Sequence, residues 1–593
     1  MTSPASVFAT ALLSTLVRAG VRDVVVCPGS RSQALALAAA AAERAGAIRL
    51  HVRLDERSAA FFALGVARET GVPAPIIVTS GTAVANLAPA VYEAHEGRVP
   101  LLILSADRPD ELRGVRSNQT TRQADMFAAV ARFSLDVPAP VAQMGDVSCN
   151  ADSRVDPEQL AHTALAAARG VQGGAPAGPV HLNLAFREPL SGDSGDLAIW
   201  EAAMAAAADP NVAASRGEGV AAVTEHSSGV YTHTDDALAV VIAGAGAGAT
   251  AEAFARAAGL PLLAEVTSRA RFGREAITAY ARLLEDPLVG GLTERAIVFG
   301  HPTLTRQIPA LLRRDDVEVV VVDPHTGDGV DHFDPSRRAR VVRAARVAED
   351  YEPAHMRRWL GAWVVADRAL REQRTAERAP DPAATRDANY KQLAAVARAE
   401  VAALRAPVTR DYLVERVWRA TWPHDRLMLA ASRLVRVLDG IAEPRRISVH
   451  ANRGLAGIDG TVATALGIAT ASQSDDAPAS AASVTRLLIG DLALLHDAGS
   501  LLLPAAEAHP RLQVFVGNDG GGTIFDTLEA ATTAAHADFE RVMYTPQHAK
   551  LQHLAVAYGW AYERAENRGE LDAACMRPVT GPTLVEVPLT REA

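Results

Sequence analysis

Short apolar runs alternate with amphipathic or alanine-rich stretches along most of the chain. The first four runs are Val24 to Cys27, Arg49 to Leu54, Ile76 to Thr79 and Leu101 to Leu104. Short buried strands separated by helices are typical of a parallel sheet with helices on both faces. Polar residues follow each run. Because the carboxyl ends of parallel strands meet at one edge of a sheet, we expect these polar residues along that edge.

The same alternation returns twice further along the chain. Apolar runs occur at Leu238 to Ala243, Pro261 to Glu265, Ala296 to Phe299 and Val317 to Val322, and again from Arg426 to Val587. The 593 residues suffice for about three to four domains. We therefore expect an α/β protein with three doubly wound parallel-sheet domains. The predicted domains are residues 1–190, residues 191–395 with a helical connector, and residues 396–593.

Three stretches lack the alternation of strand and helix. A polar stretch runs from Gly192 to about Asp236, and residues 351–405 are rich in Arg, Ala and Glu, with Pro380 and Pro382 in the middle. The second stretch is predicted to form the helical connector. Residues 473–483 are predicted to form a polar surface loop.

Charge and cysteine usage narrow the class of protein. The formal net charge of −10 argues against a nucleic-acid footprint or binding to an anionic membrane surface. No stretch is apolar and long enough to span a bilayer, and the first residues are predicted to form a helix rather than a signal peptide. The cysteines, Cys27, Cys149 and Cys575, have neither metal-site nor redox spacing. A reduced, cytoplasmic setting is the simplest interpretation.

A carboxylate and an amide follow two predicted strands in the last third of the chain. Asp491 comes after the run Leu487 to Ile489, and Asn518 comes after the run Leu512 to Val516. Mg²⁺ prefers oxygen ligands and commonly takes one or two carboxylates together with phosphate oxygens. Asp491, Asn518 and a backbone carbonyl, that of Gly520, could therefore bind a metal. The three glycines after Asp519 would let phosphates approach the backbone.

The same residues also suit two ordinary turns, since Gly-Asp and Asn-Asp-Gly occur in many turns without a ligand. The combination of two strand ends with a glycine run favours the metal site.

A second glycine-rich turn lies in the predicted middle domain. Gly244, Gly246 and Gly248 follow a predicted strand, and Glu265 ends the next one. This spacing matches a dinucleotide-binding fingerprint, but glycines in such turns also serve tight packing alone. The alanine-rich context favours packing.

Seven motifs in the outer domains share the pattern of one enzyme family. They are CPGSRS at 27–32, LDERSAAFFALG at 54–65, VTSGTAVANL at 78–87, SADRPDEL at 105–112, SNQTTRQADMF at 117–127, NRGLAGIDG at 452–460 and GNDGGGTIF at 517–525. In these motifs the chain resembles the thiamine diphosphate (ThDP) dependent 2-succinyl-5-enolpyruvyl-6-hydroxy-3-cyclohexene-1-carboxylate synthases of menaquinone biosynthesis. The match covers both outer domains, and the middle domain matches weakly.

The resemblance implies a fold, a reaction and cofactors. Enzymes of this type carry pyrimidine-binding, middle and diphosphate-binding domains. The implied transferase reaction decarboxylates 2-oxoglutarate on ThDP and adds the resulting succinyl carbanion equivalent to isochorismate. The implied cofactors are ThDP and Mg²⁺ or Mn²⁺.

The resemblance also assigns cofactor residues. Glu56 would bind the aminopyrimidine N1′ atom and favour the tautomer that removes the C2 proton. On position alone Glu56 could equally be a helix-start carboxylate favoured by the helix dipole. Leu492 replaces the second glycine of the usual ThDP metal motif, as is normal in this family. The implied cofactor contacts are Glu56, Thr82, Ile458, Gly490, Asp491, Leu492, Asn518, Gly520 and Ile524, of which Asp491, Asn518 and Gly520 would bind the metal.

The two implied substrates each carry two carboxylates, which planar guanidinium groups recognise bidentately. The resemblance places isochorismate against Ser30, Arg31 and Gln119. It assigns the acyl carboxylate or the incoming ring to Ser432, Arg436 and Arg453, and further substrate contacts in the middle domain to Arg306 and Gln307. Each of these residues also has an ordinary structural alternative, such as binding a loop carbonyl or lying on a solvated helix face.

Related enzymes form their active sites from two subunits, so the resemblance implies a homodimer or homotetramer with active sites at the subunit interface. Three alternatives remain open. The chain could be a ThDP enzyme with another acceptor, a nicotinamide-dependent dehydrogenase built on the glycines at 244–248, or a regulator without catalytic activity.

Overall fold

The computed structural model describes residues 3–141, 155–170, 174–192, 197–208, 229–325, 330–376, 390–474 and 483–591. The chain divides into two compact units, each made of separate stretches of sequence. The first unit holds residues 1–225, 452–480 and 497–510, and the second holds residues 226–451, 481–496 and 511–593. Two segments from the last third of the chain thus belong to the first unit.

The first unit contains a six-stranded parallel sheet with the strand order β2-β1-β3-β4-β6-β5. Strands β1, β3, β4 and β6 are buried along their whole length, which explains why their sequences are mainly apolar. The buried polar residues Ser105 and Asp107 of β4 form hydrogen bonds with His181 and Asn183 of β6. The strands are β1 Asp23–Val26, β2 Arg49–Val52, β3 Pro75–Val78, β4 Leu101–Asp107, β5 Phe133–Val137 and β6 Pro179–Ala185.

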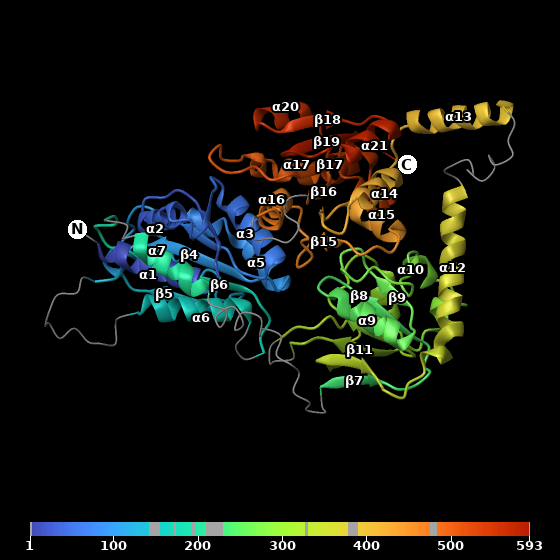
Figure 1. Ribbon diagram of the computed structural model, residues 1–593, viewed down its shortest axis with the longest axis horizontal. Helices are drawn as coiled ribbons and strands as arrows, with labels where there is room; N and C mark the ends of the chain where they lie inside the picture. Colours follow the sequence, from blue (N-terminus) through green and yellow to red (C-terminus); the bar gives the residue numbers. More distant parts are fainter. Residues whose placement is uncertain are drawn as a thin grey trace. The chain divides into compact units, whose positions relative to one another are not determined.

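Helices cover this sheet, and their ends follow the sequence. Ser3 caps α1 by accepting a hydrogen bond from the Ser6 N–H, and Asp55 caps α3 by accepting one from the Arg57 N–H. Gly71 ends α3 in the left-handed conformation, with φ of 72°. Helix α1 packs against α2, α6 and α7 (Figure 1). The helices are α1 Pro4–Arg18, α2 Gln33–Arg44, α3 Glu56–Thr70, α4 Thr82–Ala85, α5 Ala88–Glu96, α6 Pro157–Arg169 and α7 Leu197–Ala207.

Helix α16 (Thr461–Ser472) lies in the first unit and packs closely against α3. A Cβ atom on Gly65 would lie 2.2 Å from the carbonyl oxygen of Thr464, and one on Gly467 would lie 2.1 Å from that of Phe62. Each helix therefore presents a glycine to the backbone of the other. This explains why α16 is buried almost all round and carries mostly small residues.

The second unit contains two larger parallel sheets and a parallel strand pair. One larger sheet has the order β12-β11-β10-β8-β9, and the other has the order β15-β14-β16-β17-β19-β18. The first comprises β8 Ala239–Ala243, β9 Leu262–Ala264, β10 Arg295–Phe299, β11 Glu318–Val322 and β12 Arg340–Val342, beside the pair β7 Val230–His233 and β13 Ala344–Val347. The second comprises β14 Arg426–Leu429, β15 Ser448–His450, β16 Thr485–Gly490, β17 Leu512–Asn518, β18 Ala561–Arg564 and β19 Thr583–Pro588.

The three main sheets confirm the predicted α/β fold with doubly wound parallel sheets. The domain boundaries stay a prediction. Residues 82–96 form two helices, α4 and α5, separated by Asn86 and Leu87. Both residues keep right-handed helical dihedrals, but the Leu87 N–H bonds to the Val84 carbonyl three residues back, and Pro89 has no N–H to continue the helical series. Short edge strands β5, β15 and β18 were not predicted.

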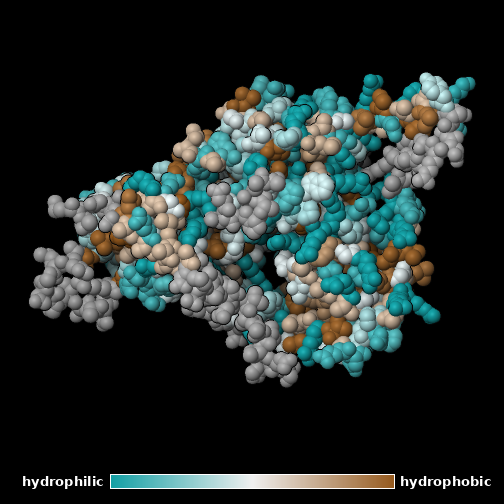
Figure 2. All heavy atoms as spheres, in the orientation of Figure 1, coloured by the Kyte–Doolittle hydropathy of each residue, from teal (hydrophilic) through white to brown (hydrophobic). Residues whose placement is uncertain are grey.

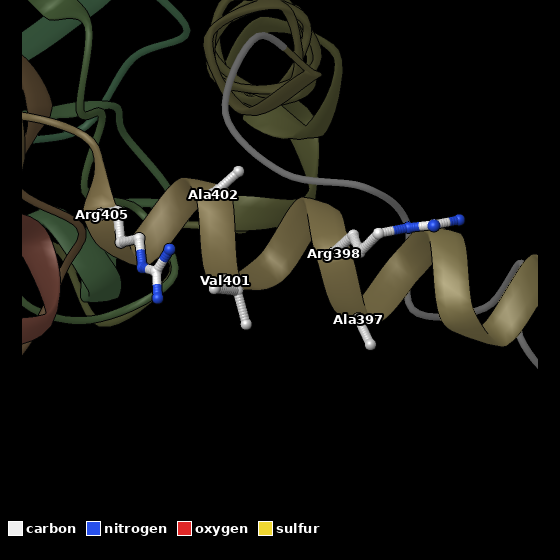
Figure 3. A pocket seen from close by; sticks show the side chains of 5 residues that line it. All are labelled: Ala397, Arg398, Val401, Ala402 and Arg405. Atoms are coloured by element: carbon white, nitrogen blue, oxygen red, sulfur yellow. The ribbon is translucent and has the colours of Figure 1, made fainter.

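The predicted helical connector contains two long helices, α12 (Arg357–Ala376) and α13 (Tyr390–Arg405), and Pro380 and Pro382 lie outside the described residues. Apolar side chains are exposed along α13, including Leu393, Val401 and Leu404 (Figure 2). A shallow pocket on this helix is lined by Ala397, Arg398, Val401, Ala402 and Arg405, with three of the side chains apolar (Figure 3). No residue predicted to bind cofactor or substrate lines it.

Two further sequence expectations concern membranes and cysteines. Among the described helices, none combines the length and apolar character needed to cross a bilayer. Cys27 and Cys575 are buried free thiols, and burial raises the pKa of Cys575 to about 12. Cys149 lies outside the described residues.

A buried charge network ties edge strand β2 to residues 497–510. His51 Nε2 lies 2.9 Å from Asp23 Oδ1, and His51 Nδ1 lies 3.5 Å from Glu507 Oε2. Glu507 also accepts hydrogen bonds from the Val52 N–H at 2.7 Å and from Arg53 Nη1 at 2.9 Å. Burial opposes protonation of His51, but the hydrogen bonds to Asp23 and Glu507 outweigh it and raise the histidine pKa.

A His51→Gln variant should be destabilised more at low pH than at high pH. The folded-state pKa of His51 is raised, so its contribution is fully present below the unfolded pKa of about 6.5 and is lost as pH rises through the folded value. We expect the loss of stability at pH 6 to be about 3 kcal/mol. Melting temperatures of both proteins from pH 5.5 to 9.5 would measure this difference.

The control is His355→Gln, since His355 is largely exposed, with 60% of its side chain accessible. Its melting temperature should follow that of the wild type at each pH. A His51→Gln deficit that is constant across the pH range would contradict a charged His51.

Candidate active site

The residues predicted to bind the metal lie at the ends of neighbouring strands in the second unit. β16 ends at Gly490, and the short helix α17 (Asp491–His496) begins with the next residue. β17 ends at Asn518 and pairs in parallel with β16, with Gly490 opposite Gly517. The side chains of Asp491 and Asn518 therefore follow adjacent strands at one edge of the sheet, as the sequence predicts.

Asp491 has the environment of a cation ligand. The residue is buried, and its Oδ2 atom has no hydrogen-bond partner among the described residues, whereas Oδ1 accepts a bond from the Leu492 N–H at 2.8 Å. Burial raises the pKa of Asp491 to about 7, and the nearby Asp519 carboxylate adds to the shift. A buried carboxylate with an unpaired oxygen is costly unless a proton or cation neutralises it.

The other two proposed donors, the Asn518 amide oxygen and the Gly520 carbonyl oxygen, suit a hard divalent ion that also binds phosphate. Asn518 Nδ2 donates to Glu586 Oε1 at 2.8 Å, which fixes the amide orientation, and its Oδ1 accepts a bond from the Gly520 N–H at 3.2 Å. Among the described residues no group of three or more His, Cys, Asp or Glu side chains could hold a metal. A set of one carboxylate, one amide oxygen and one carbonyl is completed naturally by phosphate oxygens and water.

The three glycines after Asp519 form a tight loop that packs against Tyr544. Gly520 has φ of 76°, a conformation that favours glycine, and a Cβ atom on Gly521 would lie 2.6 Å from the Tyr544 carbonyl oxygen. The Gly520 carbonyl accepts a hydrogen bond from the Gln547 N–H at 2.9 Å, which leaves it a second lone pair. Thr523 Oγ1 donates to Asp519 Oδ2 at 2.5 Å. Glycines are therefore required here by packing as well as by any ligand.

Ser432, Arg436 and Ile524 are the other residues of the second sheet region that were predicted to bind cofactor or substrate. Ser432 precedes helix α15 (Arg433–Ile441), and its hydroxyl is buried without a hydrogen-bond partner among the described residues. A Cβ atom on Gly490 would lie 3.7 Å from Ser432 Cβ, so Ser432 adjoins the end of β16. Arg436 is exposed one turn further along α15, and Ile524 is half-buried after the glycines.

In the middle sheet, the structure places the predicted residues at the start of α11 (Gln307–Leu312). Arg306 is exposed, and Gln307 Nε2 donates to Glu285 Oε1 at 2.9 Å. Nothing in the described contacts joins either residue to the metal edge.

Glu56 is the first residue of α3 in the first unit and is half-buried. Asn86 Nδ2 lies 3.5 Å from its Oε2 atom. Thr82 begins helix α4, after Gly81 with φ of 81°. Both Glu56 and Thr82 thus follow strands of one sheet at the carboxyl edge, where ligands bind in such folds.

Ser30, Arg31 and Gln119 lie along the same edge. Ser30 is exposed, Arg31 Nη1 donates to the Phe186 carbonyl at 3.2 Å, and Gln119 Nε2 donates to the Ser80 carbonyl at 2.9 Å. The loop carbonyl that was the structural alternative for Arg31 is therefore present. This contact uses one guanidinium nitrogen and leaves the remaining donors of a five-donor group for a ligand.

Two residues that were not singled out support this edge. Arg108 Nη1 donates to Ser80 Oγ at 2.7 Å and to the Gln119 carbonyl at 2.9 Å, and burial together with the nearby Arg31 guanidinium lowers the pKa of Arg108. Gln123 is buried, and its Oε1 accepts a bond from the Gly81 N–H at 2.9 Å. Both lie in quoted motifs, but only the folded chain brings them to the turn at residue 81.

The remaining predicted residues of the first unit are Arg453 and Ile458, which precede α16. Arg453 is buried, and Ile458 is exposed by 39%. The adjoining backbone is anchored by Glu93, whose Oε1 accepts from the Gly454 N–H at 2.9 Å and whose Oε2 accepts from the Leu455 N–H at 2.7 Å.

Packing and backbone conformation explain the glycine-rich turn after β8. A Cβ atom on Gly244 would lie 2.0 Å from the Pro302 nitrogen, so only glycine fits against that backbone. Gly246 and Gly248 have φ of 83° and 63°, which favours glycine. The Glu265 carboxylate, which a dinucleotide ribose would require, is fully buried and accepts hydrogen bonds from the Thr303 and Leu304 N–H groups at 2.7 and 2.6 Å. The fingerprint spacing thus arises from two tertiary contacts within the domain.

Comparison with known proteins defines the class. Residues 7–129 match the N-terminal TPP-binding domain of thiamine pyrophosphate enzymes. This range includes Ser30, Arg31, Glu56, Thr82 and Gln119. The parallel sheets and the polar carboxyl edge belong to a thiamine diphosphate enzyme.

Full-length relatives narrow the family. A 2-succinyl-5-enolpyruvyl-6-hydroxy-3-cyclohexene-1-carboxylate synthase of Leifsonia xyli is 53% identical over 99% of this chain and 97% of its own length. Synthases of the same name from Clavibacter michiganensis and Thermobifida fusca are 51% and 37% identical, over 99% and 100% of this chain and 97% of their own lengths. The chain belongs to the family of these synthases.

An Asp491→Asn variant should lose stabilisation by the metal and cofactor. Mg²⁺ with ThDP should raise the melting temperature of the wild type by about 3–6 °C at saturating concentration. The variant should show almost none of this rise, although its own melting temperature without ligands should be equal or higher, because the amide removes a buried carboxylate with an unpaired oxygen. Differential scanning fluorimetry with each ligand alone and together would measure the shifts.

Asp538→Asn, an exposed carboxylate in the same unit, serves as the control and should respond as the wild type does. NADH should leave the melting temperature of all three proteins unchanged. A full response of Asp491→Asn would rule out Asp491 as the metal ligand.

Proposed function

We propose that the protein decarboxylates 2-oxoglutarate and joins the resulting four-carbon unit to isochorismate, giving 2-succinyl-5-enolpyruvyl-6-hydroxy-3-cyclohexene-1-carboxylate and CO₂ for menaquinone biosynthesis. The observation that carries this proposal is the identity of 53% to a synthase of that name over nearly the full length of both chains. Glu56, Asp491 and Asn518, which lie at the carboxyl edges of their own sheets, support it.

Bound ThDP supplies the electron sink that makes the loss of CO₂ from a 2-oxo acid possible. The chain supplies the Glu56 carboxylate for the proton transfer that prepares ThDP for this reaction. Glu56 would bind the proton at the aminopyrimidine N1′ atom and so favour removal of the proton at C2. Glu56 begins α3, where the helix dipole favours a carboxylate side chain.

The second unit would hold the diphosphate through a divalent ion, Mg²⁺ or Mn²⁺. Asp491, Asn518 and the Gly520 carbonyl are the proposed ligands, and the unpaired Asp491 Oδ2 atom supports this assignment. Gly490, Leu492 and Ile524 would contact the cofactor beside the ion. Ser432, whose buried hydroxyl lacks a partner among the described residues, would donate a hydrogen bond into the same region.

Guanidinium groups would bind the substrate carboxylates. Arg31, with Ser30 and Gln119, lies at the edge of the first sheet, and Arg108 adds a second positive charge there. Isochorismate carries one carboxylate on its ring and one on its enolpyruvyl side chain, and two guanidinium groups could bind these two carboxylates. Arg306, Gln307, Arg436 and Arg453 are proposed as further substrate contacts, on the basis of family resemblance rather than of a described contact.

We propose that the working enzyme is a homodimer or homotetramer in the cytoplasm. Glu56 and Asp491 belong to different compact units, so two chains can complete each other's sites. The buried free thiols of Cys27 and Cys575 suit a reducing compartment.

The wild type should consume isochorismate only when 2-oxoglutarate, ThDP and Mg²⁺ are all present. A Glu56→Gln variant should be slower by at least about 100-fold, since the amide cannot take up the proton. Isochorismate absorbance and released CO₂ would be followed together. CO₂ release without isochorismate consumption would retain the ThDP enzyme and assign it another acceptor.

Activity should require association of at least two chains. Sedimentation velocity across a dilution series would give the population of monomers, and the specific activity measured at the same concentrations should fall in proportion to the oligomer that is lost. Full activity of a monomeric fraction would overturn the shared active site.

A further inference from the structure

A chain of four polar side chains links the start of α3 to the start of α16 within the first unit. Ser58 Oγ lies 3.1 Å from Asp55 Oδ2 and 2.8 Å from Ser500 Oγ, and Ser500 Oγ lies 2.7 Å from Asp497 Oδ1. Asp497 Oδ2 accepts bonds from the Val462 and Ala463 N–H groups, at 2.7 and 3.2 Å. Residues more than 400 positions apart thus form one continuous series of contacts.

The two ends of this chain carry residues assigned to the cofactor. Asp55 caps α3 and directly precedes Glu56, and Ser58 is in the same first turn. Val462 and Ala463 begin α16, directly after the loop that bears Ile458. Asp497 follows α17, whose first residue is Asp491. Within the first unit, the hydroxyl pair therefore connects the turn that carries Glu56 to the start of α16, which follows the loop that carries Ile458.

The side chains that form these contacts are buried, which makes the loss of any one contact costly. Ser58, Ser500 and Asp497 are exposed by 4%, 5% and 0%. Water cannot easily replace a lost contact at such positions, so removal of one hydroxyl leaves a neighbouring polar atom unsatisfied. The remaining groups would then shift to find new partners, and the first turn of α3, which carries Ser58, would shift with them.

The two serine hydroxyls, each of which can donate and accept, form all three oxygen-to-oxygen contacts of this series. Ser58 Oγ donates to Asp55 Oδ2 and Ser500 Oγ donates to Asp497 Oδ1, and either hydroxyl can donate across the 2.8 Å contact between them. Burial raises the pKa of Asp497, although the hydrogen bonds from Ser500 and from the Ala463 and Val462 N–H groups oppose the shift.

We propose that Ser58 and Ser500 are positioning residues, which hold the first turn of α3 so that the Glu56 carboxylate reaches the N1′ atom of the cofactor. The proposal rests on the proposed role of Glu56. Its alternative is that the four side chains only cap two helices, in which case they affect stability and not the proton transfer.

Two kinds of measurement separate these possibilities. Deuterium uptake at the C2 atom of bound ThDP, measured by rapid acid quench and NMR, reports the action of Glu56 directly. The dissociation constant of ThDP with Mg²⁺, measured by calorimetry, and the melting temperature report binding and stability.

In Ser58→Ala and Ser500→Ala, C2 deuterium uptake should slow by about tenfold, because a small displacement of a catalytic group has a large effect on the rate. The ThDP dissociation constant should change by less than about threefold. The double variant should be no slower than either single variant, since both hydroxyls belong to one series of contacts. Asp497→Asn should keep nearly the wild-type rate, because an amide can donate to Ser500 while its oxygen accepts from the α16 N–H groups.

Ser472→Ala provides a matched control. Ser472 is as buried as the pair and lies at the far end of α16, and its hydroxyl donates only to the Ala469 carbonyl. Its C2 uptake should equal that of the wild type. A normal C2 uptake in Ser58→Ala and Ser500→Ala, with Glu56→Gln still slow, would overturn the positioning role and leave the proposed function intact. A normal uptake in Glu56→Gln as well would instead overturn the role of Glu56.

Discussion

The close packing of α3 against α16 is the constraint on which the first unit depends. Gly65 and Gly467 bring the two backbones together at distances that leave no room for a Cβ atom. Such an approach fixes the relative position of the helices far more precisely than contact between longer side chains would, because the backbone cannot change rotamer. Glu56 begins one helix, and the loop with Arg453 and Ile458 leads into the other. Glycine packing at the centre therefore determines the geometry at the ends.

In the second unit, a residue proposed to bind the metal lies in surroundings that destabilise the protein when no ligand is bound. Asp491 is buried with one oxygen unpaired and Asp519 nearby, and this arrangement is unfavourable in the protein alone. Asp519 itself is well stabilised, because Arg410 and Thr523 both donate to its Oδ2 atom, at 2.9 and 2.5 Å. These two contacts hold the Asp519 carboxyl group beside Asp491, where it raises the Asp491 pKa. A divalent cation is the species that would turn this repulsion into attraction.

The sequence predicts the fold well where burial is complete. Strands such as β3 and β17 are continuous apolar runs because both faces of the sheet are covered. The strands that were missed are short edge strands, and β18, with the sequence AYER, is exposed or half-buried along its length. Their identity comes from pairing with a neighbour that is distant in the chain, and no local pattern records this pairing.

The residues of the candidate site also differ in whether the local sequence predicts them. Asp491, Asn518 and Glu56 could be found because they directly follow strands or begin a helix, and such positions can be read from local sequence. Ser58 and Ser500 could not, because a serine in a first helical turn and a serine in a loop are both ordinary by themselves. The two become informative only when the fold brings them 2.8 Å apart.

The glycines at 244–248 show why spacing alone misleads. Their separation from Glu265 matches a cofactor fingerprint, yet Gly244 is required by the backbone of Pro302, and Glu265 is occupied by the N–H groups of Thr303 and Leu304. Both contacts involve the segment after β10, the strand next to β8. A doubly wound sheet needs a tight turn after a central strand and a means of anchoring the adjacent loop, whether or not a ligand is bound. A fingerprint therefore becomes evidence for a ligand only when its glycines and its carboxylate remain free of such contacts.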